Sequence, residues 1–238
     1  MTRTILSTIL VSLSIGQAMA GPEAVSNKWK GEAELGFVSA SGNTKTETVN
    51  AKAKVTTNRD KWRHKLEAAA LGASNSADTT AERYTLTGQS DYKISEQNYF
   101  FGLVNYEKDR FSGYDYRVSE SLGYGRRVIE EPAFTLDLEV GPGARQSKLD
   151  NGDSDSEFVV RGAAKFDWFI SDTSKFSEVL TVEAGEDATI SKSVTGLTSQ
   201  IAGSMAMKLT YTIKNTSDVP PGVKNTDKET AVTLVYSF

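Results

Sequence analysis

Residues 230–238 read TAVTLVYSF, and this stretch indicates the fold class more clearly than any other. Large apolar side chains fall at every second position, namely Val232, Leu234, Tyr236 and Phe238. A period of two is typical of a β-strand with one apolar face. Because the whole chain is polar, with a mean hydropathy of −0.38, that face must meet either a packed core or lipid.

The same alternation recurs along the chain, separated by turns rich in Gly, Asn, Asp, Ser or Pro. Units of about 18 residues suit tilted membrane-crossing strands of about ten residues with short connections. Pro142 falls inside one such stretch and predicts a bulge there. We expect twelve strands, at residues 28–41, 44–57, 62–74, 80–93, 98–110, 114–128, 134–148, 155–169, 174–185, 189–200, 205–216 and 227–238.

Residues 1–20 have the features of a secretory signal peptide: a basic start at Arg3, an apolar stretch, and a small-residue cleavage motif ending at Ala20. Cleavage after Ala20 is expected, and an uncleaved signal anchor is the alternative. Residues 21–27 are then a short periplasmic segment, and residues 28–238 form a single domain.

Composition narrows the possible classes of protein. The chain has no cysteine, so we expect neither disulfides nor thiolate metal sites. It has 27 basic and 31 acidic side chains with no basic stripe, which argues against nucleic acid as a partner. No apolar run beyond the leader approaches the roughly 20 residues of a spanning helix. An exported soluble protein and a closed membrane β-barrel remain, because the barrel is the other structure that satisfies all backbone groups in lipid.

Charged residues gather on one face of the predicted strands. A soluble barrel would turn that face to water, whereas a membrane barrel turns it to the lumen. Strands 114–128 and 174–185 are less regular, because Glu120 and Glu178 fall on the apolar face. The residues expected to line the lumen are Lys52, Lys54, Arg63, Lys65, Glu67, Asp137, Glu139, Arg161, Lys165, Asp167 and Lys208.

Aromatic side chains favour the membrane barrel. If the first strand starts at the periplasm, one set of them falls at periplasmic strand ends, where amphipathic rings meet lipid headgroups. This expected girdle comprises Trp29, Trp62, Tyr92, Phe134, Trp168, Phe176 and Tyr236. Turns on that side are short, and several opposite connections, such as 149–156 and 215–228, are longer. Phe238 is expected to act as the signal read by the barrel-assembly machinery, and the outer wall to contact outer-membrane lipids and lipopolysaccharide.

Three segments resemble a known family: WKGEAELGFVSASGNTKTETVNAKAKV (29–55), YEKDRFSGYDYRVSESLGYGRRV (106–128) and VPPGVKNTDKETAVTLVYSF (219–238). They are similar to the salt-induced outer-membrane proteins, also called domain-of-unknown-function family 481. The resemblance implies a Gram-negative outer-membrane location and an association with salt or osmotic stress. It implies no activity, catalytic residue or ligand.

Other motifs in the sequence do not indicate a catalytic, metal-binding or phosphate-binding site. His64 is the only histidine, and no serine is expected within its reach, so packing at the membrane interface is the favoured interpretation. The acidic stretch 150–157 lacks the spacing of a calcium loop, so no metal site is expected. GYG (123–125) and GPG (141–143) precede no helix and are not phosphate-binding loops.

The sequence therefore predicts a closed antiparallel up-and-down transmembrane β-barrel of about 12 strands. We expect a non-enzymatic protein without cofactor in the outer membrane of a Gram-negative bacterium, and a monomer is favoured although the sequence does not fix the oligomeric state. Its expected function is envelope maintenance or a narrow pore for small solutes, with weak anion preference near Lys52, Lys54, Arg63 and Lys65. The alternatives are a lipid-acting hydrolase and a purely structural barrel with a filled lumen.

Overall fold

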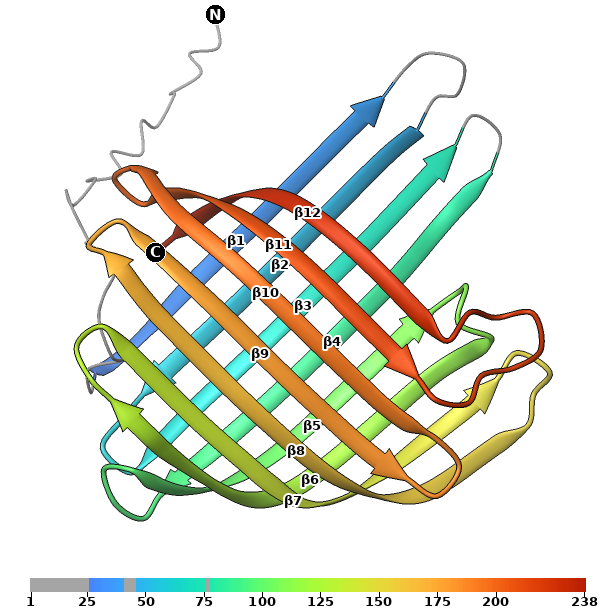
Figure 1. Cartoon of the computed structure of the whole chain (residues 1–238), viewed down its shortest axis with the longest axis horizontal. Helices are drawn as coiled ribbons and strands as arrows, with labels where there is room; N and C mark the ends of the chain where they lie inside the picture. Colours follow the sequence, from blue (N-terminus) through green and yellow to red (C-terminus); the bar gives the residue numbers. More distant parts are fainter. Residues whose placement is uncertain (1–25, 41–45, 76–77) are drawn as a thin grey trace, which may run out of the picture.

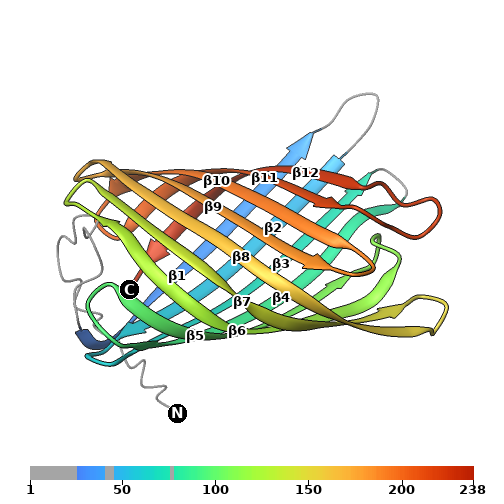
Figure 2. The ribbon, with the colours of Figure 1, turned by 60° about the horizontal axis from the view of Figure 1, so that its bottom comes forward.

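The computed structural model describes residues 26–40, 46–75 and 78–238, and these form one closed antiparallel sheet of twelve strands. Each strand pairs with its sequence neighbours, and β12 closes onto β1 (Figures 1 and 2). Within the described residues, no helix is long and apolar enough to cross a membrane. The strands are β1 (Ser26–Ala40), β2 (Thr46–Asn58), β3 (Trp62–Asn75), β4 (Thr79–Lys93), β5 (Asn98–Asp109), β6 (Tyr114–Glu130), β7 (Phe134–Leu149), β8 (Ser154–Ser171), β9 (Ser174–Gly185), β10 (Thr189–Ala202), β11 (Met205–Thr216) and β12 (Thr226–Ser237).

The expected fold class is confirmed, and all twelve predicted strands are present, with ends that differ by a residue or two. The proposed leader, residues 1–20, lies outside the described residues. Residues 26–27, expected in a periplasmic segment, belong to β1.

The two ends of the barrel differ in their connections. At the terminal end, where β1 begins and β12 ends, the turns are residues 59–61, 94–97, 131–133, 172–173 and 203–204. We call the opposite end of the barrel the loop end. There, residues 217–225 form the longest described connection. The loop expected at 149–156 is shorter than predicted, at 150–153, because β7 and β8 continue to pair up to Lys148 and Ser154.

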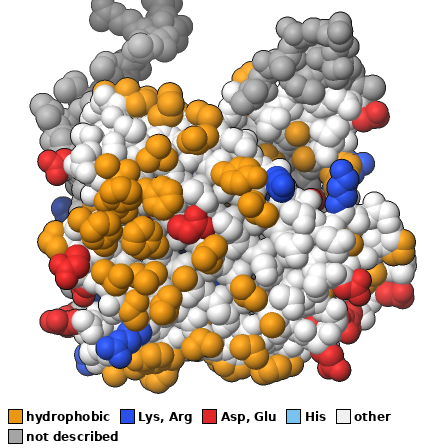
Figure 3. Space-filling view, in the orientation of Figure 1, with side chains coloured by type: hydrophobic (Ala, Val, Ile, Leu, Met, Phe, Trp, Pro, Cys, Tyr) orange, Lys and Arg blue, Asp and Glu red, His pale blue; other side chains and the backbone are white. Residues whose placement is uncertain are grey.

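The outer wall is apolar and the inner wall is polar. Leu209 is 46% and Val160 48% exposed, whereas Arg161 is 4% exposed inside the barrel. Figure 3 shows apolar side chains spread over this wall with few charged ones between them. A soluble barrel would bury its apolar residues and expose its charged ones, so this arrangement suits lipid outside.

Two carboxylates break the apolar wall. Glu178 accepts hydrogen bonds from the hydroxyls of Ser193 (2.7 Å) and Thr195 (2.6 Å) on neighbouring β10. These bonds offset part of the cost of placing a carboxylate on this face. Glu120, the other one, is exposed in the middle of β6.

The closing seam is short. β1 pairs with β12 at four positions, Glu32–Leu35 with Ser237–Leu234, whereas β1 pairs with β2 at thirteen. Gly31 and Phe238 extend the seam by exchanging backbone hydrogen bonds of 2.8 and 2.9 Å. The Phe238 ring lies over Gly31, where an added Cβ would come within 2.3 Å of it. From this seam the two strands diverge towards the loop end (Figure 1).

The bulge expected at Pro142 is wrong. The register between β6 and β7 is the same on both sides of Pro142, but pairing is interrupted between Ser121–Gly143 and Tyr124–Val140. Proline has no N–H to donate to the ladder, which accounts for the interruption. The two strands approach so closely there that a Cβ on Gly141 would lie 2.1 Å from the Leu122 carbonyl oxygen.

Candidate functional site: the charged lumen

The lumen is crossed by side chains from walls that are far apart in the sheet. Inward-pointing positions alternate with lipid-facing ones on every strand, so each strand delivers a row of side chains to the interior. These side chains form two layers, which we call the terminal-end network and the loop-end network.

The terminal-end network centres on Glu139 of β7. Its Oε1 accepts hydrogen bonds from Lys165 Nζ (2.6 Å), Gln89 Nε2 (2.9 Å) and the Tyr99 hydroxyl (3.1 Å). Its Oε2 accepts one from Arg161 Nη1 at 3.0 Å. Gln89 comes from β4 and Lys165 from β8, so this single carboxylate links strands that are four places apart in the ring.

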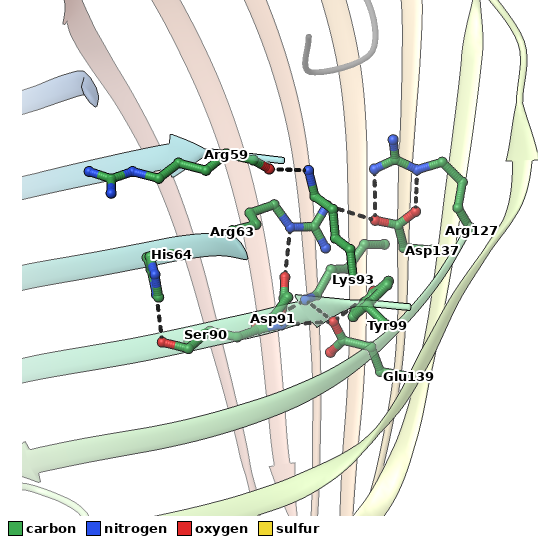
Figure 4. Close-up of polar contacts among 12 residues, drawn as sticks. Arg59, Arg63, His64, Ser90, Asp91, Lys93, Tyr99, Arg127, Asp137 and Glu139 are labelled. Atoms are coloured by element: carbon green, nitrogen blue, oxygen red, sulfur yellow. Dashed lines mark hydrogen bonds and ion pairs between the residues drawn. The ribbon is translucent and has the colours of Figure 1, made fainter. Parts of the chain in front are cut away.

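Arg63 of β3 extends the same network. Its Nε donates to Asp91 Oδ2 at 2.6 Å, and its Nη1 lies 3.7 Å from Asp137 Oδ2 of β7 (Figure 4). The guanidinium lies over the Tyr99 ring, 4.9 Å from its centroid. Asp137 Oδ1 also accepts a hydrogen bond from Arg127 Nε at 2.7 Å. Arg63 and Arg127 are therefore both matched by carboxylates.

The loop-end network joins β12 and β11 to β2, β4 and β5. Glu229 of β12 accepts hydrogen bonds from Arg83 of β4 and, at 3.2 Å, from Asn50 of β2. Glu107 of β5 likewise accepts from Lys214 of β11. β5 and β11 are six strands apart in the twelve-stranded ring, so this ion pair crosses the full width of the barrel.

The remaining predicted luminal residues form separate ion pairs along the inner wall, with Lys65 as the exception. Lys52 pairs with Glu67 (2.8 Å), and Lys54 with Glu32 (3.4 Å). Lys208 pairs with Glu34 (2.8 Å), and Asp167 with Lys175 (3.4 Å) near the terminal end. Lys65 points inward on β3 and forms no ion pair or hydrogen bond among residues 26–40, 46–75 and 78–238.

Sequence reasoning missed several charged residues of these networks. Each of them shares the inward parity of its strand, so the alternation within strands 80–93, 98–110, 189–200 and 227–238 contains the signal for them. In strand 114–128, Glu120 obscured the alternation. The missed residues are Arg83, Glu107, Arg117, Arg127, Lys192 and Glu229.

The predicted aromatic girdle lies on the outer wall at the terminal end. Most members contact a ring on the neighbouring strand: Trp62 meets Tyr92 (5.1 Å between centroids) and Phe134 meets Trp168 (6.0 Å). Phe176 meets the ring of Phe166 at 6.5 Å. Trp29 and Tyr236 lie on the exposed side of β1 and β12.

The expectation that no serine reaches His64 is wrong. Ser90 lies opposite His64 in the β3–β4 ladder, and its Oγ is 2.8 Å from His64 Nδ1 (Figure 4). The imidazole stacks on Trp62, with 5.6 Å between centroids. Sequence alone did not show this contact, because it depends on the register between two strands.

The acidic stretch at the loop end faces a second acidic turn. A side-chain hydrogen bond to Asp155, together with repulsion from Asp155, Glu157 and Glu186, raises the pKa of Asp187 above its ordinary value. Asp187 N–H also donates to Glu157 Oε2 at 3.0 Å. The carboxylates of these two turns therefore lie close together.

Comparison with known proteins places the chain in a family. A family model described as "Protein of unknown function, DUF481" matches residues 33–238. The chain belongs to this family. The DUF481 protein is also 27% identical over 226 residues to the uncharacterized protein YdiY of Escherichia coli (strain K12), covering 94% of this chain and 89% of that one.

Solved structures share the fold at low sequence identity. The NanC porin has a TM-score of 0.54 at 12% identity, covering 87% of the DUF481 chain and 98% of the porin. The COG4313 outer membrane channel from Pseudomonas putida F1 has a TM-score of 0.54 at 11% identity, covering 94% and 100%. These likenesses show a transmembrane β-barrel fold.

Proposed function

We propose that this DUF481 protein is a narrow outer-membrane pore for small hydrophilic solutes, which serves the cell envelope under salt or osmotic stress. The outer-membrane location is supported by the lipid-facing wall and by the two channels that share the fold. The link to stress rests on the resemblance to the salt-induced outer-membrane proteins.

One observation favours a pore over a filled barrel: water reaches the charged groups of the inner wall. The side chains of Lys52 and Glu67 are 26% and 27% exposed although both point into the lumen. A dry, filled interior would leave such groups fully buried, as Glu139 is at 0%. The two networks narrow this aqueous interior, so the pore admits only small solutes.

Single-channel recording in a planar phospholipid bilayer tests the proposal. Purified full-length protein should give discrete steps of low conductance in potassium chloride, because the two networks leave little open width. Heat-denatured protein is the control. A folded barrel that inserts and stays silent at all voltages would refute the pore and favour a structural barrel.

A lipid-acting hydrolase has one observation in its favour, the His64–Ser90 contact at 2.8 Å. A nucleophilic serine also needs a group that orients the histidine and donors that stabilise an oxyanion. The backbone at Ser90 is engaged in the ladders with His64 and Gly102, so it offers no free donors. We therefore propose a non-enzymatic protein in which His64 and Ser90 satisfy each other at the interface. Phospholipid turnover that is lost in both His64→Ala and Ser90→Ala would overturn this.

A further inference from the structure

The inner wall formed by β2 and β3 carries three lysines close together. Lys54 lies opposite Glu67 in the ladder between β2 and β3. Lys65 lies opposite Thr56, at the next inward-facing position towards the terminal end. Glu67 is bonded to Lys52 at 2.8 Å, and Lys54 to Glu32 at 3.4 Å. Lys65 is thus left without a carboxylate of its own in the described part of the chain.

A fourth lysine reaches this group from the opposite wall. Gln89 is the cross-strand neighbour of Lys65, and its Oε1 accepts a hydrogen bond from Lys165 Nζ at 3.1 Å. Directly opposed side chains in a ladder lie about 5 Å apart at Cβ. The strongest electrostatic neighbours of the Lys65 ammonium are accordingly Lys54, Lys165, Lys52 and a single carboxylate, Glu67.

Positive charge exceeds negative charge in this part of the lumen. Glu139 pairs with both Arg161 and Lys165, so its single negative charge does not neutralise both cations. Five cations, Lys52, Lys54, Lys65, Arg161 and Lys165, therefore face the three carboxylates Glu32, Glu67 and Glu139. The loop-end network is balanced by contrast, with Arg83, Arg117, Lys192 and Lys214 facing Glu107, Asp109, Asp227 and Glu229.

We propose that Lys54, Lys65 and Lys165 form a binding site for the carboxylate group of a small hydrophilic solute inside the lumen. Each ammonium has three N–H donors, and Lys65 has all of its donors available for an anion. Charge-assisted hydrogen bonds of this kind are the stronger ones in proteins. The inference rests on the proposed pore and specifies its solutes as organic acids.

Calorimetric titration with sodium citrate tests the site directly, using full-length protein folded in detergent micelles at low ionic strength, where screening is weak. Wild type should bind citrate, and Lys65→Gln should weaken binding by about tenfold or more, since a hydrogen bond between charged groups is lost. Lys65→Arg, which keeps the charge, should retain binding. Lys192→Gln is the matched control, because Lys192 is a luminal lysine in the balanced network, and its affinity should equal that of wild type.

Reversal potentials across a potassium chloride gradient separate this site from the pore. Wild type should prefer chloride over potassium, and Lys65→Glu should shift the preference towards potassium. A barrel that conducts no current but binds citrate through Lys65 would refute the proposed pore and support the proposed binding site. Absence of citrate binding, or equal affinities of Lys65→Gln and Lys192→Gln, would overturn the site whether or not the barrel conducts.

Discussion

Replacing Glu139 by glutamine probes the physical basis of the terminal-end network. The carboxylate is fully buried and receives hydrogen bonds from Gln89, Tyr99, Arg161 and Lys165. Glutamine keeps one acceptor oxygen but turns an amide donor towards neighbours that are themselves donors. Arg161, whose side chain is 5% exposed, then remains charged without a partner.

The expected cost follows from burial. Breaking a buried ion pair by removing one partner costs about 3–5 kcal/mol. Lys165 keeps 24% exposure and can turn towards luminal water, so the cost should fall near the lower limit. A loss of ~3 kcal/mol corresponds to a decrease of about 140-fold in the folding equilibrium constant. By the same reasoning Glu67→Gln, at a water-exposed pair, should cost less than ~1 kcal/mol.

Equilibrium unfolding in guanidinium chloride, followed by tryptophan fluorescence in detergent micelles, measures both values. A second variant, Glu139→Gln combined with Arg161→Met, should recover much of the loss, because it removes the unpaired charge as well. Equal destabilisation by Glu139→Gln and Glu67→Gln would show that burial inside this lumen does not set the strength of its ion pairs.

Three other perturbations give independent checks. Phe238→Ala removes the ring over Gly31 and should lower the free energy of unfolding by ~1 kcal/mol, measured by the same denaturation; no change would mean that the ring does not support the seam. Glu229→Gln weakens the loop-end network and should raise single-channel conductance by about twofold; an unchanged conductance would show that this layer does not limit flow. Asp155→Asn removes a neighbouring negative charge and should lower the pKa of Asp187 towards its ordinary value. Carboxyl NMR titration measures that shift, and a pKa that stayed raised would contradict the assigned cause.

The sequence by itself determined the number of strands, their approximate limits and the apolar face of each. Alternation with a period of two is a local property, because neighbouring side chains on a strand point to opposite faces. The tryptophans at strand ends also identified lipid, rather than a packed core, as the environment of that face. Glu120 and Glu178 were the exceptions, and both do lie on the outer wall.

Only the tertiary structure decided which luminal charges meet. Lys214 and Glu107 are 107 positions apart, and their contact depends on the barrel's width and on how its strands are staggered. The same holds for Ser90, which reaches His64 through the register of β3 with β4. Register and closure arise from the pairing of all twelve strands together, so no single stretch of sequence contains them. That is why the sequence could predict a charged lumen but could not show that Lys65 lies in it without an ion-pair partner among the described residues.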